Sequence, residues 1–211
     1  MFDNKGVQVH YLALGDSISI DRYTGKKGGG AASQLASRLQ VRRFDNCARD
    51  GWVTFNVAQI LPNVSGDPDV ITLTIGGNDL LMTAVNQDPQ PDSVSDWVAV
   101  AAPVLERVRV ILDQLVRFEA QIIVCTVYDP TDGEDAYLED MYLPPNARFG
   151  LAAFNKGVRR LARDYGARLS DLEELFLGHG FWSSDPWMVE VIEPNLAGAT
   201  AIANQWARLV A

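Results

Sequence analysis

Strand-like apolar segments alternate with amphipathic helical segments along the chain, and this alternation constrains the fold more than any other feature. The strand-like segments are short and rich in β-branched residues, as in the run Val-Ile-Thr-Leu-Thr-Ile at 70–75. The helical segments carry apolar side chains at three- and four-residue spacing, most clearly at 94–118. This pattern predicts a parallel sheet with helices packed on both of its faces.

The predicted elements cover most of the chain. Strands are predicted at residues 7–13, 41–47, 70–75, 122–127 and 168–172. Helices are predicted at residues 31–39, 55–61, 94–118 and 146–165, and from 195 towards the C-terminus. Pro103 is expected to kink or split the third helix, Asn146 to cap the fourth, and Gly166 to end it in the left-handed conformation. Together they predict one domain over residues 1–211, an α/β/α sandwich of three layers around a central five-stranded parallel sheet.

Length, charge and cysteine content restrict the class of protein. A chain of 211 residues is long enough for one domain that buries about 70% of its unfolded surface. The net charge of −9 argues against nucleic acid as a partner, and no apolar run is long enough to predict a membrane span. No signal peptide is recognisable, and Cys47 and Cys125 are expected to be free thiols, so a cytoplasmic location is expected. The sequence leaves the oligomeric state open.

Polar and glycine residues follow the predicted strands. Ser17, Gly51, Asn78 and Asp129 each come just after one of them. Right-handed crossovers bring the carboxyl ends of parallel strands to one edge of the sheet, and ligands bind there where the strand order reverses. We therefore expect these four residues to lie on one rim.

Four short motifs carry a resemblance to a known family. They are Gly15-Asp16-Ser17-Ile18-Ser19, Asn46-Cys47-Ala48-Arg49-Asp50-Gly51, Gly76-Gly77-Asn78-Asp79, and Glu193-Pro194-Asn195 followed by Gly198. Their order and spacing resemble those of the GDSL, or SGNH, hydrolases, a family of serine esterases and lipases with a flavodoxin-like fold. The resemblance covers the whole chain and is most specific in the first and third motifs.

The resemblance implies a role for each motif. Ser17 would be the nucleophile, and the N–H groups of Ser17 and Gly51 and the side-chain amide of Asn78 would form the oxyanion hole. Such donors are aimed at the charge that develops on a carbonyl oxygen during acyl transfer. Asp16 is expected to support the turn that carries Ser17.

The residue that should activate Ser17 departs from the family pattern. The family's last motif usually reads Asp-x-x-His-Pro, whereas this chain has Glu190-Val191-Ile192-Glu193-Pro194. A serine hydroxyl needs a base, because it is a poor nucleophile until its proton is taken. Glu193 could be that base if burial and the charge of Glu190 raise its pKa.

Two alternatives to a glutamate base remain open. His179, in the glycine-flanked segment 178–180, could reach the rim as the base, with Glu193 or Asp185 orienting its ring. Alternatively, catalysis has been lost and the cleft only binds its ligand. His10 lies inside the first predicted strand, which makes it a poor candidate.

The acidic segment 129–140 is expected to overhang the rim. It is either a solvated loop or a lid in which Tyr137, Met141 and Tyr142 contact substrate. Its spacing matches no calcium-binding loop, so no metal site is expected. Phe181, Trp182 and Trp187 either wall a pocket or pack against the sheet.

These observations predict a hydrolase that cleaves a small-molecule carboxylic ester through an acyl-enzyme on Ser17, without a cofactor. A catalytically inactive cleft that binds acylated or carbohydrate ligands is the alternative. A nucleotide-binding or signalling module on the same fold is the second alternative.

Overall fold

A five-stranded parallel sheet forms the centre of the molecule, as predicted. The computed structural model describes residues 9–86, 91–144 and 146–211. In this part of the chain the large sheet has the order β2-β1-β3-β4-β5, and every neighbouring pair is parallel. The strands are β1 (His10–Gly15), β2 (Arg43–Asn46), β3 (Val70–Thr74), β4 (Gln121–Cys125) and β5 (Arg168–Ser170). The order reverses between β1 and β3, so the edge between their carboxyl ends is the expected place for a ligand.

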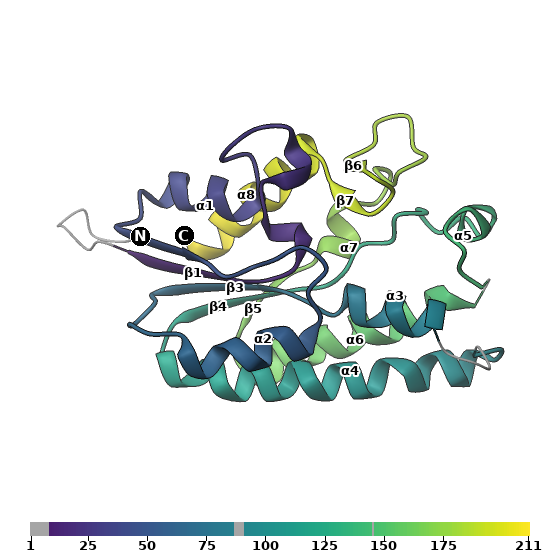
Figure 1. Cartoon of the computed structure of the whole chain (residues 1–211), viewed down its shortest axis with the longest axis horizontal. Coiled ribbons are helices and arrows are strands. Elements are labelled where there is room, and N and C mark those ends of the chain that lie inside the picture. Colours follow the sequence, from purple (N-terminus) through teal and green to yellow (C-terminus); the bar gives the residue numbers. More distant parts are fainter. Residues whose placement is uncertain (1–8, 87–90, 145) are drawn as a thin grey trace.

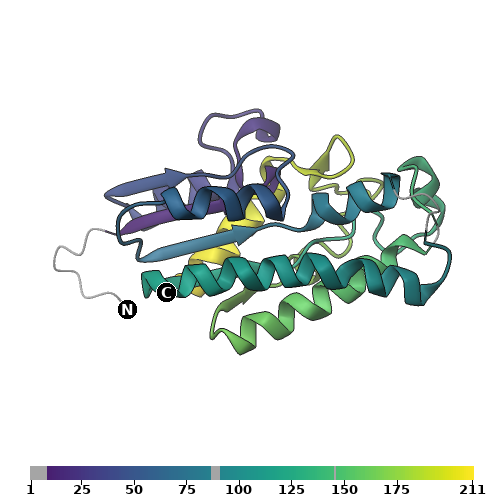
Figure 2. The same ribbon diagram turned by 60° about the horizontal axis from the view of Figure 1, so that its bottom comes forward.

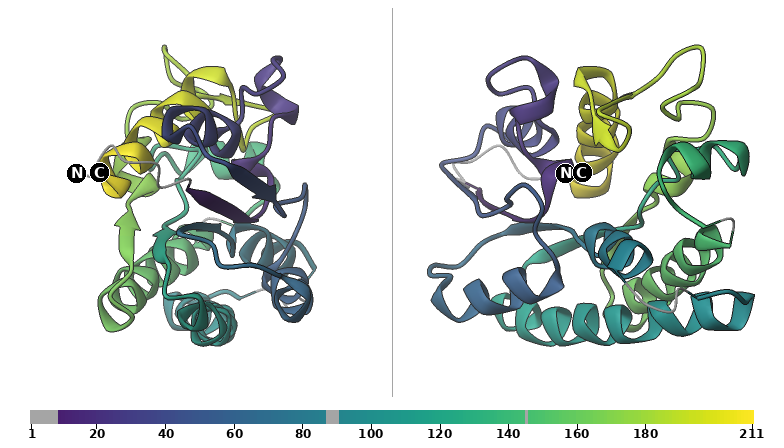
Figure 3. Two further views of the ribbon diagram at one scale, coloured as in Figure 1. Left: turned by 90° about the vertical axis from the view of Figure 1, so that its left-hand side faces the viewer. Right: turned by 45° about the vertical axis from the view of Figure 1, so that its right-hand side comes forward.

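Helices cover both faces of the sheet (Figures 1 and 3). One face carries α1 (Ala31–Leu39) and α8 (Leu196–Val210), and the other carries α2 (Thr54–Ile60), α4 (Val94–Leu115) and α6 (Ala147–Asp164). Successive residues of β1 belong to different cores: Leu12 and Leu14 pack with the second set of helices, and Tyr11 and Ala13 with the first. The central strands β1 and β3 are therefore buried on both sides, as in a doubly covered parallel sheet.

Several short elements lie beyond the carboxyl ends of the strands. They are the 3₁₀ helices η1 (Ser17–Ser19) and η2 (Arg22–Thr24), the helices α3 (Gly77–Asn86), α5 (Ala136–Asp140) and α7 (Leu172–Leu175), and the antiparallel pair β6 (Met188–Val189) and β7 (Glu193–Pro194). Two further 3₁₀ turns, η3 (Leu61–Asn63) and η4 (Val116–Phe118), extend α2 and α4. None of the short elements at the rim was predicted, and α3 stands where the sequence suggested only a turn.

The predicted helices and strands agree with the structure apart from their ends and two details. Residues 7 and 8 of the first predicted strand lie outside the described residues. The long helix α4 is not split at Pro103 (Figure 2). Proline has no N–H to donate to the carbonyl of Ala99, but Ala99 is exposed, so its carbonyl can bond to water instead. The buried side of α4 meanwhile packs on α6. Asn146 is the N-cap residue of α6, yet its side chain donates to the carbonyl of Asp92 instead of accepting a capping bond. Gly166 follows α6 with a φ of 63°, as expected.

Gly15 lets β1 approach β3 at the rim. Its φ is 133°, and a Cβ added there would lie 1.9 Å from the carbonyl oxygen of Thr74. Gly15→Ala is expected to lower the free energy of unfolding by about 4 kcal/mol or more, measured by urea denaturation, because the clash is with backbone. Gly25→Ala is the matched control: its φ of 66° is also positive but its Cβ would meet no atom within 4 Å, so about 1–2 kcal/mol is expected. Equal losses in the two variants would contradict this explanation.

Among the described residues, no helix combines the length and apolar character needed to cross a bilayer.

Candidate active site

The loop after β1 holds Ser17 in a fixed position at the rim. Asp16 caps η1 by accepting a hydrogen bond from the Ile18 amide at 3.2 Å, while its own amide donates to the carbonyl of Thr74 at 3.0 Å. The hydroxyls of Ser19 and Thr74 are hydrogen-bonded at 2.9 Å. The loop is thereby attached to the end of β3. The helix α3, which carries Asn78 in its first turn, follows β3 directly.

Asn78 and Asp79 join the third motif to the segment that contains Gly51. The amide of Asn78 donates one hydrogen to the carbonyl of Trp52 at 2.9 Å, which leaves its second hydrogen for another acceptor. The buried carboxylate of Asp79 accepts from the amide and the hydroxyl of Thr54 at 2.9 and 2.6 Å, and from Arg107 at 3.1 Å. Asp79 therefore holds the first turn of α2, which fixes the preceding loop.

Gly51 lies in the turn that precedes α2. Its φ is 69°, a conformation that favours glycine, and a Cβ there would meet no atom within 4 Å. Neither its N–H nor that of Ser17 donates a hydrogen bond to any residue in the described ranges. Both amides are therefore available to a ligand.

Glu193 lies on β7, buried beside Ser17. The exposed fraction of Glu193 is 8%, and its Oε2 has no hydrogen-bond partner among the residues that the structure describes. Burial raises the pKa of Glu193, and the charges of Asp50 and Glu190 raise it further, while the neighbouring Ser17 hydroxyl and the charge of Arg22 lower it. The net direction is upward, as required of a carboxylate base.

Asp16 is a second buried carboxyl group near Glu193. Burial raises the pKa of Asp16 to about 7, the hydrogen bond from the Ile18 amide and the neighbouring Thr74 hydroxyl oppose the rise, and the charge of Glu193 adds to it. Two neighbouring carboxyl groups do not ionise independently, because each charge disfavours the other.

Glu190 and His179 lie outside this cluster. Glu190 is exposed in the turn between β6 and β7, with a φ of 49°, and it acts on Glu193 through its charge. The His179 ring stacks on Trp187 with centroids 3.6 Å apart, and its Nδ1 lies 3.0 Å from the carbonyl oxygen and 3.4 Å from the carboxylate of Asp185. The structure thus gives His179 an acidic neighbour but places it outside the lining of the cavity that contains Ser17.

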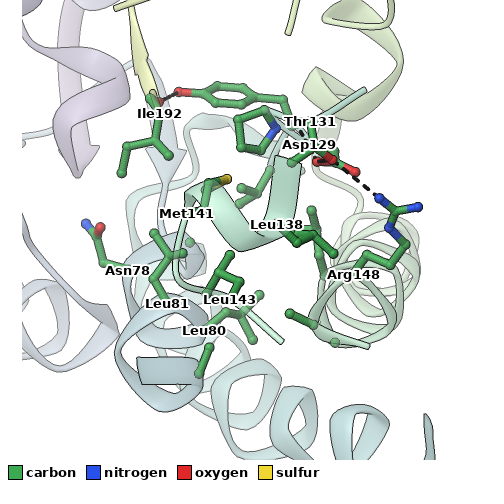
Figure 4. Close-up of a pocket in the computed structure, with 18 of the residues that line it drawn as sticks. Asn78, Leu80, Leu81, Asp129, Thr131, Leu138, Met141, Leu143, Arg148 and Ile192 are labelled. Atoms are coloured by element: carbon green, nitrogen blue, oxygen red, sulfur yellow. Dashed lines mark hydrogen bonds between the residues drawn. The ribbon is translucent and has the colours of Figure 1, made fainter. Parts of the chain in front are cut away.

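The cavity extends from Ser17 between α3, α4, α5 and α6 (Figure 4). It encloses about 870 Å³ of empty space including its open mouth. Asp16, Ser17, Ile18 and Asn78 contribute to its lining, and most of the remaining wall is apolar. That apolar wall includes Leu80, Leu81, Ala84, Leu138, Met141, Leu143, Ala147 and Leu151.

The acidic segment contributes part of this wall. Met141 lines the cavity as expected, whereas Tyr142 is largely exposed and Tyr137 stacks on Trp182 at 4.6 Å. The carboxylate of Asp132 accepts from the amides of Gly178 and Gly180 at 3.0 and 2.8 Å, which joins the segment to the loop before β6. The segment is therefore a packed cover of the cavity, and Trp182 supports it from outside.

Sequence reasoning missed the wall formed by α3, α4 and α6. The apolar residues after Asn78, at positions 80, 81 and 84, have the spacing of a helix face and could have indicated it. Arg148, from α6, and Trp97, from α4, also line the cavity. Nothing in their local sequence distinguishes them from ordinary surface and core residues.

Comparisons with known proteins agree with this geometry. The model of the GDSL-like lipase/acylhydrolase family matches residues 13–201. The chain belongs to that family. No curated protein sequence matches it.

Solved structures of GDSL-type and other esterases share the fold. A phospholipase A1 from Streptomyces albidoflavus NA297 is 20% identical, with coverage of 96% of this chain and 98% of its own and a TM-score of 0.67. An extracellular lipase from Streptomyces rimosus is 24% identical, with 96% and 98% coverage and a TM-score of 0.61. An acetyl xylan esterase, AlAXEase, is 17% identical, with 95% and 100% coverage and a TM-score of 0.70. At these identities the likeness establishes the fold of this GDSL-family chain, and its substrate has to be argued from its own site.

Proposed function

We propose that this GDSL-family protein hydrolyses carboxylic esters of apolar acyl groups through an acyl-enzyme on Ser17, with Glu193 as the general base. One observation carries the proposal: Ser17 and Asn78 line the same apolar cavity, and the buried carboxylate of Glu193 lies on β7, which packs against the η1 turn that carries Ser17. The proposed nucleophile and oxyanion donor thus face a space that can hold an acyl chain, and the proposed base lies beside the nucleophile.

The reaction then has two steps, acylation of Ser17 and hydrolysis of the acyl-enzyme. Ser17 Oγ attacks the carbonyl carbon while Glu193 takes its proton, and the oxyanion accepts from the Ser17 and Gly51 amides and from Asn78. The tetrahedral intermediate breaks its bond to the alcohol oxygen, and Glu193 returns the proton to that oxygen. Water then attacks the acyl-enzyme, again losing its proton to Glu193, and the free acid and the Ser17 hydroxyl are released.

A glutamate can serve as the base here because of its surroundings. Its unperturbed pKa of about 4.3 lies about 2 units below that of histidine, which would weaken proton abstraction by about 3 kcal/mol at equal geometry. Burial and the charges of Asp50 and Glu190 recover part of this difference by raising the pKa of Glu193.

The apolar wall supports an acyl chain longer than acetyl as the group transferred. Ala84 lies in α3 beyond Asn78 and is 3% exposed. Ala84→Leu is expected to narrow the cavity and to shift the preferred ester towards shorter acyl chains, lowering kcat/KM for the longest accepted chain by at least about tenfold. The measurement is kcat/KM for p-nitrophenyl esters of increasing chain length. An unchanged chain-length profile would contradict the assignment of this cavity to the acyl group.

Two measurements on the purified chain test the proposed function. Turnover of p-nitrophenyl esters is expected, and a fluorophosphonate is expected to label the protein once, with the adduct located at Ser17 by peptide mass spectrometry. Binding of ester analogues without any turnover would favour the inactive cleft. A label on another residue would refute the site.

A further inference from the structure

Two buried hydrogen-bond donors of the cavity wall have no partner. Trp97 is 2% exposed, and its indole Nε1 makes no hydrogen bond within the described residues. The Nε of Arg148 is likewise buried and unpaired there. Both residues line the same cavity as Ser17. A buried donor without an acceptor is costly, so buried donors of this kind are normally satisfied.

The two donors belong to one region of the wall, away from the reacting centre. Trp97 lies near the start of α4 and Arg148 near the start of α6. The starts of these two helices are in contact, since a Cβ added to Gly150 in the first turns of α6 would lie 3.1 Å from Cε3 of Trp97. Figure 4 shows Arg148 and Asn78 on opposite sides of the cavity, so this region is the end remote from the oxyanion hole.

The rest of the Arg148 guanidinium is already engaged. Nη1 is paired with the carboxylate of Asp135 at 3.0 Å and also donates to the carbonyl of Gly133, while Nη2 lies 3.4 Å from the hydroxyl of Thr131. These contacts hold the group in place and balance its charge locally. The donors left unpaired are one N–H of Arg148 and one N–H of Trp97. Because the charge of Arg148 is already balanced, this pair suits an uncharged oxygen better than a carboxylate.

We propose that the remote end of the cavity binds an uncharged acceptor oxygen, a keto or hydroxyl oxygen carried by the acyl chain well beyond its ester carbonyl. The inference rests on the proposed function for the orientation of the chain, with the ester carbonyl at Ser17. The preferred substrates are then esters of oxygenated acyl groups. An unsubstituted chain of equal length fills the same space but leaves both donors unpaired.

Binding of non-hydrolysable analogues tests this subsite without relying on turnover. The probes are primary amides of one medium-length acyl chain, either unsubstituted or carrying a keto oxygen at successive carbons, titrated into the wild-type protein by calorimetry. One keto position is expected to bind about tenfold more tightly than the unsubstituted amide, the effect of pairing one or two buried donors. Trp97→Phe keeps an aromatic side chain but removes the N–H together with the five-membered ring, and it is expected to lower this ratio severalfold, because the Arg148 N–H remains.

Trp206→Phe is the matched control. Trp206 is fully buried on the α1–α8 side of the sheet and donates to the hydroxyl of Ser170 at 3.1 Å, outside the cavity. The keto preference is expected to persist in this variant. Keto amides that never bind better than the unsubstituted one, or a preference that Trp97→Phe leaves undiminished, would overturn the inference. A preference in binding by a protein that cleaves no ester would uphold the subsite and refute the proposed hydrolysis, so the two proposals fail separately.

Discussion

Replacing Ser17 by alanine is expected to lower kcat for p-nitrophenyl ester hydrolysis by about 10⁴-fold or more, leaving at most the residual rate that the oxyanion hole and substrate binding support. The substitution removes the oxygen that would carry the acyl group. The Asp16 cap and the bond between Asp16 and Thr74 remain, since both use atoms other than the Ser17 hydroxyl. The fold and the melting temperature are therefore expected to be retained, as checked by circular dichroism.

Ser19→Ala is the matched control for this experiment. Ser19 lies two residues from Ser17 on η1 and is fully buried, and its hydroxyl bonds to Thr74. Its loss costs one buried hydrogen bond of the loop, about 1 kcal/mol, so activity within about tenfold of wild type is expected. The fluorophosphonate should label Ser19→Ala and fail to label Ser17→Ala. The reverse labelling would show that Ser19 is the nucleophile and would contradict the assignment of Ser17.

The sequence predicted the sheet and the outer helices well because their signals are local. Periodic apolar residues define α1, α4 and α6, and continuous apolar runs define β1, β3 and β4, so hydrophobic burial alone determines their place. The positions of Ser17 and Asn78 followed from topology, since carboxyl ends of parallel strands share an edge. Both residues indeed line one cavity.

The cover of the cavity could not be predicted in the same way. Its position depends on contacts between distant segments, such as Asp132 with the amides of Gly178 and Gly180, and Tyr137 with Trp182. Such contacts leave no periodic signal. The contacts of His179 also leave no local signal in the sequence. Its flanking glycines suggested a mobile side chain that could act as the base, whereas its ring is packed on Trp187.

Glu193→Gln is expected to reduce kcat/KM by about 10³- to 10⁴-fold, the usual contribution of a general base to the activation of a serine. The amide has the shape of the carboxyl group but cannot take the Ser17 proton. The measurement is steady-state hydrolysis of the ester preferred by the wild type. His179→Ala is the companion variant, because it removes the other candidate base, and it is expected to retain activity within about tenfold of wild type.

The pH profile distinguishes the two bases further. A carboxylate base must be deprotonated, so wild-type kcat/KM should fall as pH decreases through the pKa of Glu193, which burial places above its ordinary value. Glu190→Gln removes a negative charge that raises this pKa, so the acid limb should move to lower pH. Arg22→Gln removes a positive charge that lowers it, so the limb should move to higher pH. Shifts in these opposite directions are expected if Glu193 titrates in the rate-determining step. A limb that neither variant moves, together with inactivity of His179→Ala, would assign the proton to the histidine.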